Sequence, residues 1–180
     1  MERSSILRLA GAVVLTAGAL LGPASVNAAS HPSGHHAAAP TWVSTKGKTV
    51  SLTLIAGYNN NGSGFNFNGA SKGQLTVTVP LGDVVNVTFS NNASLPHSAQ
   101  VIAFSKTIPA SSVSDAFKNA NSANPTSGVV KGKVQKFSFT VNKAGTYLII
   151  CPVPGHALAG MWDTLVVSKS AHTASVSLKK

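Results

Sequence analysis

The sequence predicts an all-β protein, a sandwich of short antiparallel strands with one long inserted excursion. Apolar and polar residues alternate by twos in segments such as 74–79 and 136–141, which is the period of a half-buried strand. Turn-forming residues separate these segments, and no long stretch repeats with the period of a helix. Short strands at this spacing are typical of an antiparallel sandwich.

The predicted strands are rich in Val, Ile, Thr and Phe. In chain order they span residues 49–55, 74–79, 84–90, 99–104, 134–141, 145–150 and 163–168. The turns between them contain Asn, Gly, Pro and Asp, which favour tight turns, and they lie at 59–62, 68–69, 80–83, 91–92 and 142–145. The long excursion covers residues 106–132, and its segment 113–118 is predicted to form one helical turn.

Residues 1–28 have the three-part form of a secretory signal peptide. Arg3 and Arg8 precede an apolar run at 9–21, and small residues follow up to Ala28. Because a helix needs about 20 residues to span a bilayer and this run is shorter, we expect cleavage after Ala28, with retention as a membrane anchor as the alternative. The protein would then work in the periplasm or on the extracytoplasmic face of the membrane. The remaining parts are a flexible lead-in at 29–41, the folded domain at 42–170, and a tail at 171–180 that is frayed or forms a weak last strand.

The charge balance is strongly basic, with 14 Lys and Arg against 4 Asp and Glu and a formal net charge of +10. The lysines are scattered, without a dense basic run or interleaved aromatic residues, so nucleic-acid binding is not expected. Such a surface favours an anionic partner. Because few carboxylates change charge in acid, little stability rests on them, and we hypothesise an acidic habitat.

The single cysteine, Cys151, excludes a disulfide framework and a zinc site built from several thiolates. It begins a loop rich in Pro and Gly in which Cys151, His156 and Met161 recur at intervals of five residues. A thiolate, an imidazole and a thioether are ligands that suit copper. Upstream, His97 follows a turn at the mouth of a predicted strand, and a sandwich can bring that strand end beside the loop.

Each of these residues has a simpler interpretation when taken alone. A lone buried Cys or Met usually fills a core, and a single His at a strand start is usually a surface or satisfied side chain. Together, two His and one Cys with a distant Met are the ligand set of a blue-copper site, which suits outer-sphere electron transfer. We therefore predict that His97, Cys151, His156 and Met161 bind copper.

The sequence resembles the cupredoxins, and among them the sulfocyanin- and rusticyanin-like group, over roughly residues 50–167. The residues that resemble the family lie in segments 65–69 (Phe-Asn-Phe-Asn-Gly), 79–83, 95–98 and 151–162. The resemblance implies a Greek-key sandwich and one type 1 copper per chain, held by His97, Cys151 and His156 with Met161 as the axial ligand. It also implies electron transfer in a respiratory chain, often of acidophiles, with redox partners such as cytochromes or a terminal oxidase. Ser98, where many blue copper proteins have Asn, resembles the rusticyanin arrangement associated with high potential and acid tolerance.

The predicted function is one-electron transfer by a monomer that is not an enzyme. In this interpretation His156 is the electron port, inside an apolar collar of Pro152, Val153, Pro154, Ala157, Leu158 and Ala159. The alternative is a periplasmic copper-binding or copper-handling protein of the same fold.

Other copper functions fit the sequence less well. Multicopper oxidases and copper nitrite reductases need additional His clusters, and this chain has only 6 His. A copper-A domain needs two bridging Cys. A plain structural sandwich leaves the Cys-His-Met loop unexplained. A cleaved amino terminus beginning Ala29, Ser30, His31 could chelate Cu(II), and the alternative there is an unoccupied tail.

Overall fold

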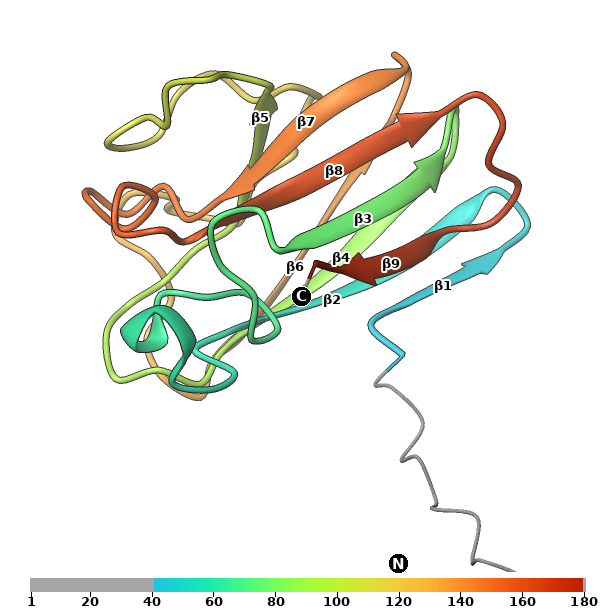
Figure 1. Cartoon of the computed structure of the whole chain (residues 1–180). Helices are drawn as coiled ribbons and strands as arrows, with labels where there is room; N and C mark the ends of the chain where they lie inside the picture. Colours follow the sequence, from blue (N-terminus) through green and yellow to red (C-terminus); the bar gives the residue numbers. More distant parts are fainter. Residues whose placement is uncertain (1–40, 180) are drawn as a thin grey trace, which may run out of the picture. The chain divides into compact units, whose positions relative to one another are not determined.

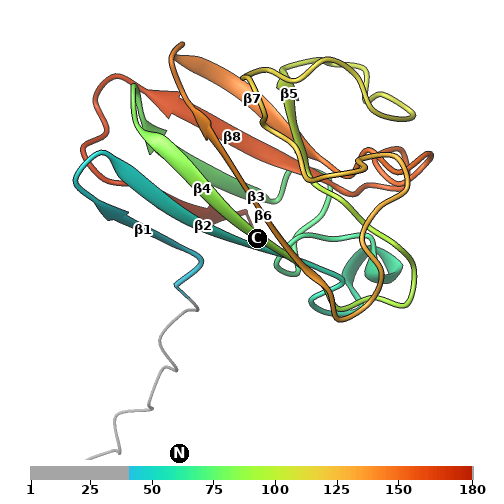
Figure 2. The ribbon, with the colours of Figure 1, turned by 180° about the vertical axis from the view of Figure 1, so that it is seen from behind.

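The computed structural model describes residues 41–179, which form two β-sheets packed face to face (Figure 1; Figure 2). The four-stranded sheet has the order β1-β2-β4-β6, and the five-stranded sheet has the order β5-β7-β8-β3-β9. The strands are β1 (Val43–Lys46), β2 (Thr49–Ala56), β3 (Leu75–Pro80), β4 (Val84–Asn91), β5 (Gln100–Ala103), β6 (Val134–Thr140), β7 (Gly145–Ile150), β8 (Trp162–Ser168) and β9 (Ser175–Leu178). Within the described residues the only helical element is the 3-10 turn η1 (Asn61–Gly64). The predicted all-β sandwich is confirmed.

The core lies between the two sheets and follows the two-residue alternation of the strands. On β2 the buried residues are Val50, Leu52, Leu54 and Ala56, and the residues between them are more exposed. β7 differs, because its last four residues, 147–150, are all buried. Its outer face is covered by the excursion, from which Ile108 packs against a second apolar cluster that includes Leu148.

The direction of two strand pairs corrects the prediction of a purely antiparallel sandwich. β2 pairs with β4 in parallel, and β3 pairs with β8 in parallel, whereas the other pairs are antiparallel. The reason lies in the chain path. After β2 the chain crosses to the other sheet to form β3, reverses at the tight turn 81–83, and returns beside β2 as β4 (Figure 2). Two reversals leave β4 running in the same direction as β2.

The excursion at 106–132 contains turns and bends, and the helical turn predicted at 113–118 is absent. Its backbone instead pairs with β5: the Val101 N–H donates to the Ala120 carbonyl (2.8 Å), and the Ala116 N–H donates to the Val101 carbonyl (2.9 Å). These backbone groups are used on the edge of the sheet and are not available for a helical turn. The excursion therefore covers the free edge of β5.

Two short strands lie outside the seven that the sequence predicted. β1 precedes the first predicted strand, and β9 pairs antiparallel with β3, so of the two expectations for the tail it is the weak last strand that is present. The predicted signal peptide and the copper-chelating terminus at Ala29 lie outside the described residues. None of the helical structure in residues 41–179 is long and apolar enough to cross a membrane.

Candidate metal centre

Loops at one end of the sandwich, on the left of Figure 1, bring the candidate ligands together. Cys151 directly follows β7, and Met161 directly precedes β8, so the ten-residue step between them turns back on itself. The Cys151 N–H donates to the Met161 carbonyl (3.0 Å), and the Met161 N–H donates to the His156 carbonyl (3.0 Å). Gly155, with a φ of +83°, supplies the left-handed turn just before His156. The loop is therefore closed at its base by the backbone of the ligand residues themselves.

His97 reaches the same place from the turn that follows β4. Its backbone forms an isolated bridge with Val129 of the excursion: the His97 N–H donates to the Val129 carbonyl (3.1 Å), and the Val129 N–H donates to the His97 carbonyl (2.6 Å). Gly128 packs against this bridge, because a Cβ there would lie 3.0 Å from the His97 nitrogen and 3.0 Å from Val153 Cγ2. The excursion thus holds the His97 segment against the Cys151 loop.

Three donor atoms converge at this point. The Nδ1 atoms of His97 and His156 lie 3.0 Å apart, and Cys151 Sγ lies 3.8 Å from the first and 3.5 Å from the second. A point equidistant from all three is about 2 Å from each, close to the bond lengths of imidazole and thiolate ligands to a borderline metal ion. Within residues 41–179 this is the one group of three or more His, Cys, Asp or Glu side chains with metal-binding proximity. The donor set fits copper.

Burial differs among the four candidate ligands. Cys151 and Met161 are fully buried, His97 is 1% exposed, and His156 is only partly buried. His156 is therefore the one candidate ligand that is not buried. The predicted exposure of His156 is present in the structure, although two residues of the predicted collar, Pro152 and Ala157, are buried and do not belong to the surface.

The protonation of the site favours a bound cation. Burial and the neighbouring His156 lower the pKa of His97 to about 4, and burial also lowers the pKa of His156. Both imidazoles are therefore neutral ligands near neutral pH. Burial raises the pKa of the Cys151 thiol, an effect that backbone N–H groups from Ser98 and Val153 partly offset. A cation at the centre stabilises the thiolate that burial alone disfavours.

Ser98 is fully buried beside the thiol. Its N–H donates to Cys151 Sγ (3.4 Å), and its hydroxyl donates to the Pro125 carbonyl of the excursion. Ser98 therefore links the sulfur to residues 106–132 through the backbone and side chain of one residue.

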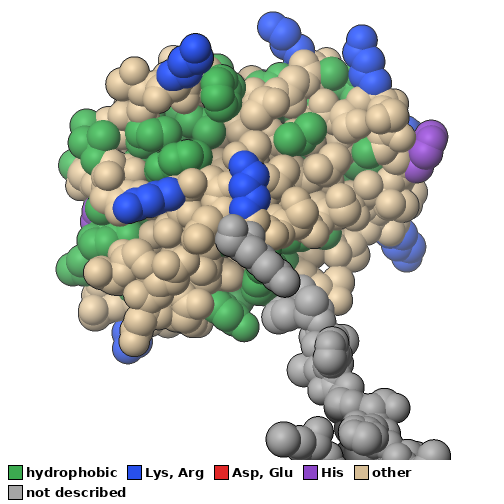
Figure 3. Space-filling view, viewed as in Figure 1, with side chains coloured by type: hydrophobic (Ala, Val, Ile, Leu, Met, Phe, Trp, Pro, Cys, Tyr) green, Lys and Arg blue, Asp and Glu red, His purple; other side chains and the backbone are tan. Residues whose placement is uncertain are grey.

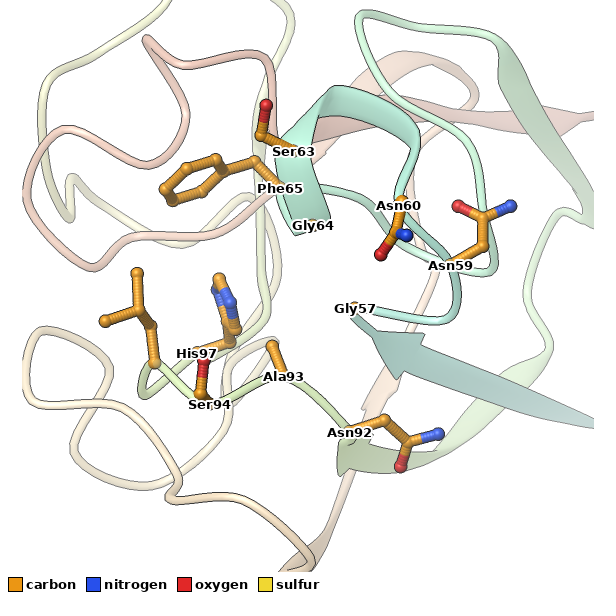
Figure 4. A pocket seen from close by; sticks show the side chains of 11 residues that line it. Gly57, Asn59, Asn60, Ser63, Gly64, Phe65, Asn92, Ala93, Ser94 and His97 are labelled. Atoms are coloured by element: carbon orange, nitrogen blue, oxygen red, sulfur yellow. The ribbon is translucent and has the colours of Figure 1, made fainter.

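One residue at the site was not among the ligands or collar residues predicted from the sequence. Phe65 lies edge-on to the rings of both His97 and His156. It also lines a polar cavity of about 250 Å³ that has His97 on its wall (Figure 4). The sequence placed Phe65 in a family motif but gave no signal of this contact, because 32 positions separate it from His97. His172, in contrast, is exposed and outside the cluster.

Comparisons with known proteins agree with this geometry. The family model described as Sulfocyanin (SoxE) domain matches residues 37–176. A sulfocyanin of Sulfolobus acidocaldarius is 34% identical over 134 residues, which cover 71% of this chain and 67% of the relative. A rusticyanin of Acidithiobacillus ferrooxidans is 34% identical over 131 residues, which cover 69% of this chain and 80% of the relative. A crystal structure of rusticyanin variants superposes with a TM-score of 0.51 at 26% identity, covering 69% of this chain and 80% of that one. The chain belongs to the sulfocyanin family, within the sulfocyanin- and rusticyanin-like cupredoxins.

Proposed function

We propose that the protein is a small blue copper electron carrier that works outside the cytoplasm in a respiratory chain. The observation that supports it most directly is the convergence of His97, Cys151 and His156 on one point. Met161 is the proposed axial ligand, because it is fully buried and its backbone forms hydrogen bonds with the backbones of both Cys151 and His156. Family membership supports type 1 copper as the cofactor, with one ion per chain.

Bound copper supplies a one-electron couple, and the residues of this chain hold its surroundings constant. The two His side chains are neutral donors, and the closed base of the Cys151 loop limits how far the donors can move. Burial of His97, Cys151 and Met161 keeps water away from three of the four donors. A site that changes little in shape on gain or loss of an electron suits outer-sphere transfer.

The proposed docking surface surrounds the partly exposed ring of His156. Leu158 is 60% exposed and Leu95, from the His97 turn, is 51% exposed, and Pro154 and Ala159 are also exposed. Leu95 adds a residue that the sequence-based collar did not include. This rim is apolar, with Lys72 beside it at Ala159, and an apolar rim permits close, brief contact, which is the character of small redox interfaces.

The remaining surface favours an anionic redox partner, such as a cytochrome or an oxidase subunit with acidic residues around its electron-entry site. Lysines are spread over the face shown in Figure 3 and do not form one dense patch. Charges arranged in this way raise the rate of encounter without fixing one orientation. The copper-handling alternative is less favoured, because a site with three buried donors does not release metal readily.

Visible absorption tests the proposal directly. The purified protein is mixed with Cu(II), and its spectrum is recorded before and after ascorbate, with Cys151→Ser as the matched control. We expect an intense band near ~600 nm that bleaches on reduction and is absent from the control, because such a band needs a thiolate bound to copper in a trigonal site. A colourless wild-type protein would overturn the proposal. Stoichiometric copper without electron exchange with any redox partner would favour copper handling instead.

A further inference from the structure

We propose that Phe65 is a positioning residue that closes the copper site between the two imidazoles and keeps outside ligands away from them. The inference rests on the proposed copper function and adds a residue that binds no metal. Its basis is the contact of one aromatic ring with two imidazoles, the way the loop before β3 is built, and the cavities that Phe65 lines.

The ring of Phe65 contacts both imidazoles in the same edge-to-face manner. Its centroid lies 4.9 Å from the ring of His156, at an interplanar angle of 76°, and 5.9 Å from the ring of His97, at 83°. The two imidazoles are 4.7 Å apart. Edge-to-face pairs at these distances are favourable beyond the area that they bury. One side chain therefore restrains both rings relative to each other.

Asn66 fixes the chain directly after Phe65. It is fully buried. Its Nδ2 donates to the carbonyls of Asn59 (2.8 Å) and Asn61 (2.7 Å), and its Oδ1 accepts from the backbone N–H groups of Tyr58 (3.1 Å) and Gly69 (3.1 Å). Both N–H donors of the Asn66 amide and both lone pairs of its oxygen are therefore used inside the loop. A buried and satisfied amide of this kind holds a loop in one conformation.

The chain directly before Phe65 has an unusual backbone. Gly62, Ser63 and Gly64 have φ values of +57°, +56° and +88°. Ser63 is not a glycine, and a left-handed conformation costs such a residue roughly 1 kcal/mol or more. The surrounding structure therefore has to impose this turn. The turn places the next side chain, Phe65, beside the His97 ring (Figure 4) and against the ring of His156.

Phe65 also lines two separate surface cavities. The first, shown in Figure 4, has His97 on its wall together with Asn59, Asn92 and Ser94. The second is bordered by Lys72 and by Ala159 of the ligand loop. Neither cavity has an Asp or Glu in its lining, so small anions can enter both. Because His97 already lines the first cavity and His156 lines neither, loss of the Phe65 ring would extend these polar openings to the second imidazole, that of His156.

Azide is the probe for this closure, and Phe65→Ala is the main variant. Cu(II)-loaded proteins are titrated with azide while the visible spectrum is followed, and the Cu(I) forms are mixed with a bicinchoninate chelator to measure the rate of copper loss. Tyr58→Ala is the matched control, because Tyr58 is an exposed aromatic residue of the same loop that packs on Trp42. Phe65→Leu tests whether an apolar side chain of similar size restores the closure.

We expect Phe65→Ala to bind azide and to lose Cu(I) about tenfold faster than wild type, as the loss of two aromatic pairs would allow. Phe65→Leu is expected to exclude azide as wild type does but to lose Cu(I) faster, because leucine restores the apolar cover and not the aromatic pairs. Tyr58→Ala is expected to resemble wild type in both measurements. The Cu(I) wild-type protein should also show nuclear Overhauser effects between the Phe65 ring and both imidazoles. A Phe65→Ala variant that excludes azide as well as wild type does, or a Tyr58→Ala variant that admits it equally, would overturn the proposal. If wild type itself is not blue, the proposed function fails instead, and the two failures are distinguished.

Discussion

Replacement of Asp163 by Asn should change how the stability of the protein depends on pH. The side chain is fully buried in β8, where its Oδ1 accepts from the Leu75 N–H (2.9 Å) and its Oδ2 has no hydrogen-bond partner. Burial raises the pKa of this carboxyl from 3.8 to about 8, an effect that the Leu75 N–H only partly offsets. In the folded protein Asp163 is therefore a neutral acid throughout the acidic range.

The sign and the size of this pH dependence of stability follow from proton linkage. Between pH 4 and pH 8 the unfolded chain loses the Asp163 proton while the folded chain keeps it, so this group makes the free energy of unfolding fall as the pH rises. The pKa values of 3.8 and about 8, at about 1.36 kcal/mol per pKa unit, give on the order of 5 kcal/mol over this window. In Asp163→Asn the term is absent. Because the buried Oδ2 has no hydrogen-bond partner, the N–H groups of an amide at its position would be left unpaired, which costs the variant about 1–3 kcal/mol in acid.

We therefore expect the two stability curves to cross. Wild type should be the more stable protein at pH 4 and the less stable at pH 8, as measured by urea unfolding of the metal-free proteins with tryptophan fluorescence. His97 and His156 titrate in the same window with the opposite sign, because burial lowers their pKa values. Their effect is present in both proteins and cancels in the difference. Curves that stay parallel from pH 4 to pH 8 would mean that Asp163 is already ionised in the fold and would refute the reasoning.

Three further substitutions test the metal centre and its support. Met161→Gln is expected to retain copper and to lower the reduction potential, because an amide oxygen is a harder axial ligand than a thioether; cyclic voltammetry with an unchanged potential would argue against an axial Met161. His156→Ala should open a position on the metal, so that added imidazole restores the blue band, and a variant that stays blue without imidazole would contradict the assignment. Gly128→Ala should lower the free energy of unfolding by about 1–3 kcal/mol, because its Cβ would lie 3.0 Å from the His97 nitrogen and Val153 Cγ2; an unfolding midpoint equal to that of wild type would show that this packing is loose.

The buried neutral carboxyl of Asp163 and the small number of ionised carboxylates both mean that little stability is lost when carboxylates become protonated in acid. The chain has 4 Asp and Glu residues in all, and the protonated Asp163 contributes most in acid. The acidic habitat, drawn from composition, stays a hypothesis with which the protonated Asp163 is compatible.

The role of residues 106–132, which the sequence left open, has a structural answer. They cover the edge of β5 and pair with the His97 backbone through Val129. The Pro125 carbonyl also accepts a hydrogen bond from the Ser98 hydroxyl. Further contacts reach the ligand loop, where the Gly155 N–H donates to the Ala110 carbonyl (2.7 Å). The excursion is thus a support for both ligand-bearing segments.

Features that depend on neighbouring residues could be predicted from the amino-acid sequence alone. Val, Ile, Thr and Phe content, with alternation by twos in several segments, predicted seven strands whose ends lie within one residue of those of β2 to β8, because the side chains of a strand alternate between core and solvent. The spacing of Cys151, His156 and Met161 in a Pro- and Gly-rich loop predicted that these residues share a site. In both cases the signal lies within a dozen residues of chain.

Features that depend on segments far apart in the chain could be seen only in the folded protein. The parallel pairing of β2 with β4 follows from a crossing between sheets, and the missing helical turn at 113–118 follows from pairing with β5. The approach of Phe65 to both imidazoles and the burial of Asp163 likewise need loops and strands that are far apart in the chain. Such contacts leave no local period, since they are set by which surfaces the two sheets and their covering loops bury against each other.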